Sequence, residues 1–215
     1  MTGVTGDFAQ AIRQSSKVLA VRGRVLPSTM QSVTLCAEVA GAQHQIQGES
    51  QIPRAGVPIE RVFLQPDDVR GYGEAVQALL GADVIVVGPG SLYTSILPNL
   101  LVRDIAAAIR ASDAIKVYVC NVATQPGETD GYTAQAHIQA LERHIGSGVV
   151  DRILVNAHLP KGAPIVDDTA CEWVRPEGIV SDDPRVVAAD LTDDECDGYH
   201  NSNRLAETLI GLLRT

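Results

Sequence analysis

The sequence predicts an α/β protein, a three-layer αβα sandwich with a mostly parallel, Rossmann-like sheet and a small antiparallel β insertion. Short uncharged runs rich in valine and isoleucine, such as residues 84–87, are typical of strands buried on both faces of a parallel sheet. Segments with the helical spacing of apolar residues alternate with these runs. Between residues 18 and 65 the pattern is mostly β-like with short connections, which favours antiparallel pairing.

Composition narrows the class of protein. The chain has 215 residues, of which 45% are hydrophobic and 20% charged, which suits one globular domain over residues 1–215. Residues 18–65 then form a β-rich insertion within it. Aromatic residues make up only 4%, so the core must be aliphatic. A net charge of −9 without a clustered basic face argues against nucleic acid as a partner.

Nothing in the sequence indicates a membrane or an oxidising compartment. No apolar run approaches the roughly 20 residues that a transmembrane helix needs, and the first residues lack a signal pattern. The cysteines lie far apart without a Cys-x-x-Cys pair: Cys36, Cys120, Cys171 and Cys196. We therefore expect reduced thiols in a cytoplasmic protein, and neither a zinc site nor a disulfide framework.

In the first third of the chain, a capping-box pattern at Asp7 and Gln10 predicts a helix. Strands are expected at residues 18–21, 32–39, 44–49 and 59–64. The third of these strands should pair with the second across a turn near Gly41. His44 and Glu49 could be cast as an acid and a base, but beside a hairpin tip we expect solvated surface groups. A helix over residues 72–80, ended by Gly81, should carry Tyr72, Val76, Leu79 and Leu80 on one face.

Strands and helices alternate in the rest of the chain. Strands are expected at residues 84–87, 116–120, 153–155 and 186–189. Helices are expected from Pro98, from about Ala134 and from about Ser202, whereas residues 157–184 look irregular. The last helix should bury Leu205, Leu209, Leu212 and Leu213. His137 and His144 lie seven residues apart, which is not the spacing of a metal pair on a helix, although His137 could face the ligand pocket.

Two polar loops each follow a strand of the predicted sheet. Residues 88–95 read Gly-Pro-Gly-Ser-Leu-Tyr-Thr-Ser, and residues 121–133 carry many hydrogen-bonding side chains. In parallel sheets ligands bind at the carboxyl ends of the strands, where both loops would meet. The glycines allow close backbone approach to a phosphate, but there is no lysine, so the first loop is not a Walker-type loop. A purely structural turn is the alternative.

The two stretches GPGSLYTSILPNLLV and VYVCNVATQPGETDGYTAQAH resemble the YvcK family, the gluconeogenesis factors, which are similar in fold to phospholactyl transferases. The resemblance implies a UDP-sugar sensor linked to gluconeogenic carbon metabolism and to cell-shape and cell-wall control. Family members also open with a glycine-rich phosphate loop that is not found here. At the family's Arg-His-Asp segment this chain has Tyr199, His200 and Asn201, without the arginine that the family ties to nucleotide-sugar binding.

The ligand site expected from the two loops comprises Gly88, Pro89, Gly90, Ser91, Thr94, Ser95, Asn121, Thr124, Gln125, Glu128 and Thr129. Backbone N–H groups and hydroxyls would hold phosphate, while Asn121, Thr124 and Gln125 would read a sugar or base edge. Glu128 either accepts from a ligand hydroxyl or is a solvated loop charge.

We expect no metal bound by the protein itself, although Mg²⁺ could accompany a nucleotide ligand through Glu128 and Asp130. Homo-oligomerisation is open. The first alternative function is a transferase that moves a phospholactyl-type group from a nucleotide carrier to an alcohol. The second is a chain that has lost ligand binding and keeps only an interaction surface.

Overall fold

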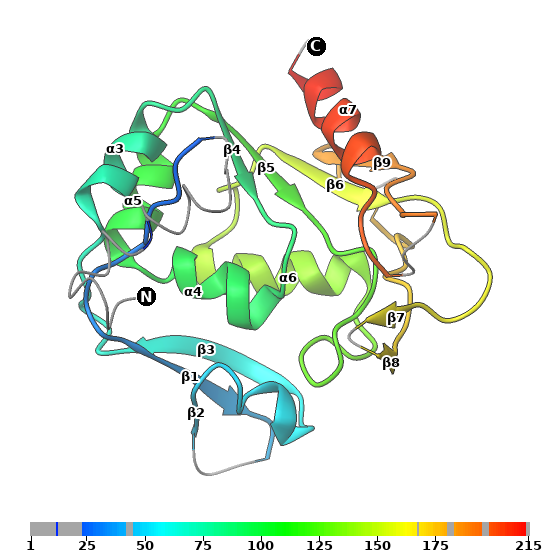
Figure 1. The fold of residues 1–215 in the computed structure, drawn as a ribbon, viewed down its shortest axis with the longest axis horizontal. Helices are drawn as coiled ribbons and strands as arrows, with labels where there is room; N and C mark the ends of the chain where they lie inside the picture. The colour runs from blue at the N-terminus through cyan, green and yellow to red at the C-terminus, as the bar shows by residue number, and fades with distance from the viewer. Residues whose placement is uncertain are drawn as a thin grey trace.

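A parallel sheet of four strands forms the centre of the computed structural model, which describes residues 12, 23–41, 45–166, 168–179, 183–194 and 198–213. The strand order is β4-β5-β6-β9, and every pairing is parallel (Figure 1). The strands are β4 (Val84–Val87), β5 (Ile115–Val119), β6 (Arg152–Asn156) and β9 (Val186–Ala189). These are the strands that the uncharged apolar runs predict, so the α/β class is confirmed.

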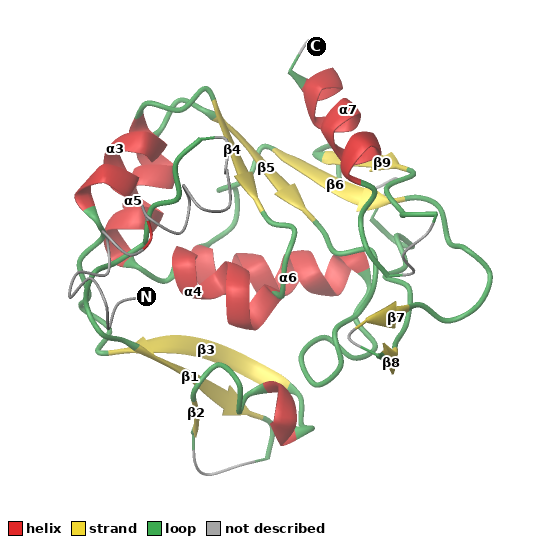
Figure 2. Cartoon of the chain, in the orientation of Figure 1, coloured by secondary structure: helices red, strands yellow, loops and turns green. Residues whose placement is uncertain are grey.

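Helices cover both faces of this sheet (Figure 2). One face carries α3 (Gly73–Leu80), a π-helix (Leu92–Ile96), α4 (Leu97–Leu100), α5 (Arg103–Ala111) and α6 (Ala134–Ile145). The other face carries α7 (Ser202–Leu212). Successive strand residues point to opposite faces, so Tyr118 joins the core on the α6 side, while Val117 and Val119 join the smaller core under α7.

A second, antiparallel sheet lies on the far side of α4 and α6, so these helices lie between two sheets (Figure 1). Its order is β2-β1-β3, from β1 (Thr34–Val39), β2 (Ile46–Gln47) and β3 (Ile59–Gln65). Cys36 lies opposite Gln47, which confirms the predicted antiparallel pairing of these segments. A short 3-10 helix (Pro53–Ala55) follows β2. Glu49 is exposed, as expected, and His44 lies outside the described residues.

The helix expected to start at Pro98 begins earlier and is broken. The π-helix runs into α4, and α5 leaves at 75° after Leu101 and Val102. Apolar side chains of this segment are buried on more than one side: Leu92, Ile96, Leu97, Leu100 and Val102. Only Ser95 and Asn99 are exposed between Ser91 and Leu100, so the solvated stripe is too short for periodicity to locate the start of the helix or its bend.

Burial at the last helix was overestimated from the sequence. Leu213 after α7 is 45% exposed, and Leu80 on the apolar face expected of α3 is 43% exposed. Leu205, Leu209 and Leu212 are only partly buried, because α7 packs on the sheet along one side. The helix predicted at Asp7 and the strand predicted at residues 18–21 lie outside the described residues.

The stretch predicted to be irregular contains one small hairpin, β7 (Ile165–Val166) with β8 (Thr169–Ala170). Within the described parts of the chain, no single helix is long and apolar enough to cross a membrane. One bent pair, Leu92–Leu100 with Arg103–Ala111, meets the test by length and composition only.

Candidate functional site

The turn after β4 uses its two glycines differently. Gly88 has φ +89°, and a Cβ there would lie 2.9 Å from the carbonyl oxygen of Val119 on β5. Gly90 has φ +154°, but the nearest atom to a Cβ there would be the Cβ of Ser95, at 3.7 Å. Gly88 therefore allows the turn to pack on the neighbouring strand, whereas a Cβ at Gly90 would make only ordinary van der Waals contacts.

A chain of hydrogen bonds joins the two loops. The Gly90 N–H donates to Asn121 Oδ1 (3.3 Å), Asn121 Nδ2 donates to Gln125 Oε1 (3.1 Å), and Gln125 Nε2 donates to Ser91 Oγ (2.6 Å). Because β4 and β5 are parallel neighbours, their loops meet at one edge of the sheet. The structure thus brings together Gly90, Ser91, Asn121 and Gln125 of the expected site, hereafter the amide ring.

A second contact ties Glu128 to the π-helix. Thr94 Oγ1 donates to Glu128 Oε1 (2.7 Å), and the Glu128 side chain is buried. Burial raises the pKa of Glu128, while the Thr94 hydroxyl acts in the opposite direction. Glu128 Oε2 has no hydrogen-bond partner among the described residues. Glu128 is therefore not a solvated loop charge, and Thr94 already uses one of its oxygens.

Two threonines of the second loop serve the fold. Thr124 pairs with Glu172 through two bonds, its N–H to the Glu172 carbonyl (2.8 Å) and the Glu172 N–H to its hydroxyl (3.0 Å). Thr129 Oγ1 accepts from the Gln125 N–H (2.9 Å). Both threonines are almost completely buried, so they shape the loop. Ser95 is exposed, and the side chain of Asn99 donates to its carbonyl.

A cavity of about 350 Å³ opens beside the amide ring. Pro89, Gly90, Asn121 and Gln125 line one side, and the start of α7 with the segment before it supplies Tyr199, His200 and Ser202. The His200 ring lies with Nε2 3.2 Å from the Cys120 carbonyl at the end of β5, and burial lowers the pKa of His200. The resemblance drew attention to this segment, but sequence reasoning did not place it in the site, because 65 residues or more separate it from both loops.

A second cavity, of about 480 Å³, lies on the other side of the turn. Its walls are mostly aliphatic, from β4, α3 and α5, with Ser28, Ser95 and Asn99 as polar members. Arg24 also lines it but pairs with Glu74. Gly88 and Pro89 line this cavity too, so every residue of the turn from Gly88 to Gly90 borders at least one of the two cavities.

His137 does not face either cavity. Its side chain is completely buried, packed edge-on against Tyr132 with ring centroids 5.4 Å apart. Tyr132 in turn shares a 2.8 Å hydrogen bond with Tyr93 of the π-helix. Desolvation lowers the pKa of His137 to about 4. Among the residues that the structure describes, no group of three or more His, Cys, Asp or Glu side chains could hold a metal ion.

The arrangement defines an α/β protein with a cavity of ligand size at the carboxyl ends of two parallel strands. A family model described as 2-phospho-L-lactate transferase CofD matches residues 1–184, and the chain belongs to this family.

The chain is also similar to proteins named "Gluconeogenesis factor" from Halalkalibacterium halodurans (46% identical over 98% of this chain) and Bacillus subtilis (42% identical over all of it). A crystal structure of a UPF0052 family protein from Bacillus halodurans superposes with a TM-score of 0.83, at 43% identity over 97% of the chain. The resemblance to gluconeogenesis factors is confirmed. The chain spans 66% and 69% of the two relatives' lengths, and 69% of the solved structure.

Proposed function

We propose that the chain is a non-catalytic regulatory protein of the gluconeogenesis factor type that binds a nucleotide sugar, such as a UDP-sugar. The amide ring beside the cavity is the observation that carries the proposal. Carboxamides offer both donors and acceptors, which suits the edges of bases and the hydroxyls of sugars. In this proposal, ligand occupancy links carbon metabolism to cell shape and the cell wall.

The positions of the carboxylates near the two loops favour binding over catalysis. Glu128 is buried and bonded to Thr94, and no carboxylate is among the described residues that line the cavity at the amide ring. A transferase needs a positioned base or a metal that holds the diphosphate.

Calorimetry with a panel of nucleotides and nucleotide sugars tests the proposal. We expect a UDP-sugar to bind, and Asn121→Ala to weaken it about tenfold, because the variant breaks two bonds of the amide ring. Gln139→Ala, on the exposed side of α6, is the matched control and should bind normally. An Asn121→Ala protein that binds as well as the parent, with an equal melting temperature, would contradict this site.

A second candidate is a transferase of phospholactyl-type groups, favoured by the description of the matching family model. Here Glu128 and Asp130 would hold Mg²⁺ with a nucleotide-linked donor. Incubation with a phospholactyl-nucleotide donor and acceptor alcohols, with and without Mg²⁺, followed by mass spectrometry, tests it. A metal-dependent product that is lost in a folded Glu128→Gln variant would replace the sensor proposal.

A further inference from the structure

The cavity at the amide ring has no charged side chain among the described residues that line it. Its polar lining consists of amides, hydroxyls, backbone and one histidine: Gly90, Asn121, Gln125, Tyr199, His200 and Ser202. No Lys, Arg, Asp or Glu is among the described residues that line it. His200 adds no charge at neutral pH, because burial lowers its pKa below the usual value.

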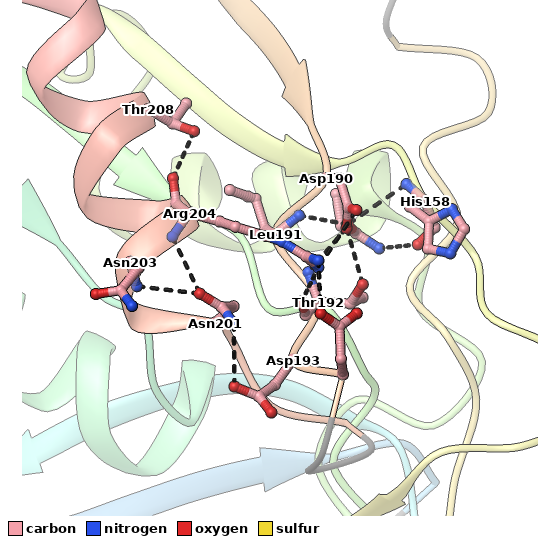
Figure 3. A network of polar contacts seen from close by, with 11 residues as sticks. His158, Asp190, Leu191, Thr192, Asp193, Asn201, Asn203, Arg204 and Thr208 are labelled. Carbon is pink, nitrogen blue, oxygen red and sulfur yellow. Dashed lines mark hydrogen bonds and ion pairs between the residues drawn. The ribbon is translucent and has the colours of Figure 1, made fainter.

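Arg204, the only cation of α7, pairs with groups that do not line the cavity. Arg204 donates to the Thr192 carbonyl (2.6 Å) and pairs with Asp190 (3.3 Å) and Asp194 (2.6 Å). Figure 3 shows its guanidinium among Asp190 and Thr192, while Asn201 caps the start of the helix. Arg204 is thus paired with carboxylates and is not among the residues that line the cavity.

The neutral groups keep unused hydrogen-bonding capacity. Within the amide ring, Asn121 and Gln125 each use one N–H and one lone pair, which leaves a second N–H and a second lone pair on each. The Ser91 hydroxyl accepts from Gln125 and can still donate. With the Nε2–H of His200 directed to the Cys120 carbonyl, Nδ1 of the neutral ring is an acceptor.

We propose that this cavity binds an uncharged ring rich in hydroxyl or amide groups, the nucleoside or the sugar part of the ligand, and leaves the phosphates outside. The inference rests on the proposed function and names the part of the ligand that this cavity selects. Its volume of about 350 Å³ is near the lower end of the range for small-molecule sites, which suits one part of a nucleotide sugar. The cavity offers neutral hydrogen-bonding groups, whereas a phosphate site usually supplies contacts from Arg or Lys.

Two ligand series test the proposal by calorimetry: uridine, UMP and UDP, and N-acetylglucosamine with its 1-phosphate. The expected result is that one uncharged parent compound binds, and that its phosphates change the dissociation constant by no more than about threefold. Raising the salt from about 0.05 to about 0.3 M should have little effect, because no charge pair forms in the cavity. The series whose parent binds shows whether the nucleoside or the sugar occupies the site.

A variant that adds a positive charge at the cavity tests whether the missing cation limits phosphate binding. Tyr199 lies at the rim of the cavity, with 47% of its surface exposed, so the position can accept a long side chain. Tyr199→Lys should tighten UDP binding about fivefold or more without tightening uridine binding, since the lysine supplies the missing cation. Tyr199→Gln, which removes the ring without adding charge, is the matched control and should give no such gain.

The outcomes separate this inference from the proposed function. If UDP binds at least tenfold more tightly than uridine, with strong salt dependence, the neutral-cavity inference is wrong while nucleotide binding stands. If uridine or N-acetylglucosamine binds about as well as its own phosphates but no nucleotide sugar binds, the inference stands and the proposed function fails. If no compound binds at millimolar concentration, both are wrong.

Discussion

Gly88 and Gly90 are two residues apart in one turn but meet different constraints. Both have a positive φ, which costs an L-residue about 1–3 kcal/mol. Only at Gly88 would a Cβ also press on backbone, at 2.9 Å from the Val119 carbonyl. The packing of the turn on β5 therefore depends on Gly88, whereas Gly90, which borders the cavity at the amide ring, is constrained only by its backbone conformation.

This difference predicts opposite effects for two matched variants. Gly88→Ala should lower the free energy of unfolding more than Gly90→Ala, because it adds a backbone clash to the strain. Gly90→Ala should instead weaken ligand binding more than Gly88→Ala does, when the loss of affinity of each variant is compared with its loss of unfolding free energy. Urea unfolding and calorimetry on both variants measure these effects. Equal stability losses would show that the clash is relieved by a small shift of the turn.

His137 provides a residue-scale prediction about pH. In the folded protein its pKa is about 4, whereas the ordinary value is 6.5. Between these values the unfolded chain binds a proton that the folded chain does not, so stability falls as pH decreases through this window. The loss should reach about 2–3 kcal/mol between about pH 7 and about pH 4.5.

His137→Gln isolates this contribution, since His144 and His200 also have lowered pKa values and titrate in both proteins. The gap in unfolding free energy between parent and variant should shrink on acidification, measured by urea unfolding at several pH values. A gap that stays constant with pH would mean that the pKa of His137 is the same in the folded and unfolded states.

At the scale of elements, α6 completes the edge of the antiparallel sheet. The buried Val62 N–H on β3 donates to Nε2 of His144 (3.0 Å), and Nδ1 of the same ring lies 2.7 Å from the Ala140 carbonyl within the helix. β3 is an edge strand of the described β2-β1-β3 sheet. His144 thus satisfies an edge donor that would otherwise be buried without a partner.

Removing this acceptor should loosen the sheet from the helix. His144→Phe keeps a ring beside Tyr93, whose centroid is 5.9 Å from that of His144, but leaves the Val62 N–H unpaired. The expected cost is about 1–3 kcal/mol in unfolding free energy. Amide hydrogen exchange at Val62 should also become faster. Gln139→Ala on the same helix should change neither measurement, and unaltered Val62 exchange in His144→Phe would refute the assigned role.

At the scale of the whole molecule, the loop after β5 (residues 121–133) packs against the segment that follows β2 of the antiparallel sheet. A Cβ at Gly127 would lie 1.9 Å from the carbonyl oxygen of Pro53, in the 3-10 helix after β2. The loop that carries Asn121 and Gln125 is therefore placed by contacts to both sheets. A shift of the antiparallel sheet would move the amide ring, so the two halves should act together in ligand binding.

Gly127→Ala tests this coupling. The variant should lose about 3 kcal/mol or more of unfolding free energy, or separate the loop from the turn and lose ligand affinity. Gly131→Ala in the same loop is the matched control. It has a similar φ of +71° but no atom within 4 Å of a Cβ, so it should cost only about 1–2 kcal/mol. Comparable, small losses in both variants would exclude a tight contact at Pro53.

The parallel strands, and the place where their loops meet, follow from the sequence alone. Residues 84–87 and 117–119 are short, uncharged, apolar and rich in β-branched valine, which favours buried strands over helices. Neighbouring parallel strands then bring both loops to one edge of the sheet. Gly88 and Gly90 mark this turn in the sequence, because glycine adopts the positive φ that both positions have. These features follow from local composition.

Which polar side chains line the cavity follows only from the tertiary structure. Thr124, Thr129 and Glu128 looked as available as Asn121 and Gln125, yet the first two bond to the loop or to Glu172, and Glu128 is buried against Thr94. A donor or acceptor binds whatever partner the fold places within about 3 Å, and sequence separation does not reveal that partner. The cavity wall at His200 and the bend after Leu101 depended on the same three-dimensional packing.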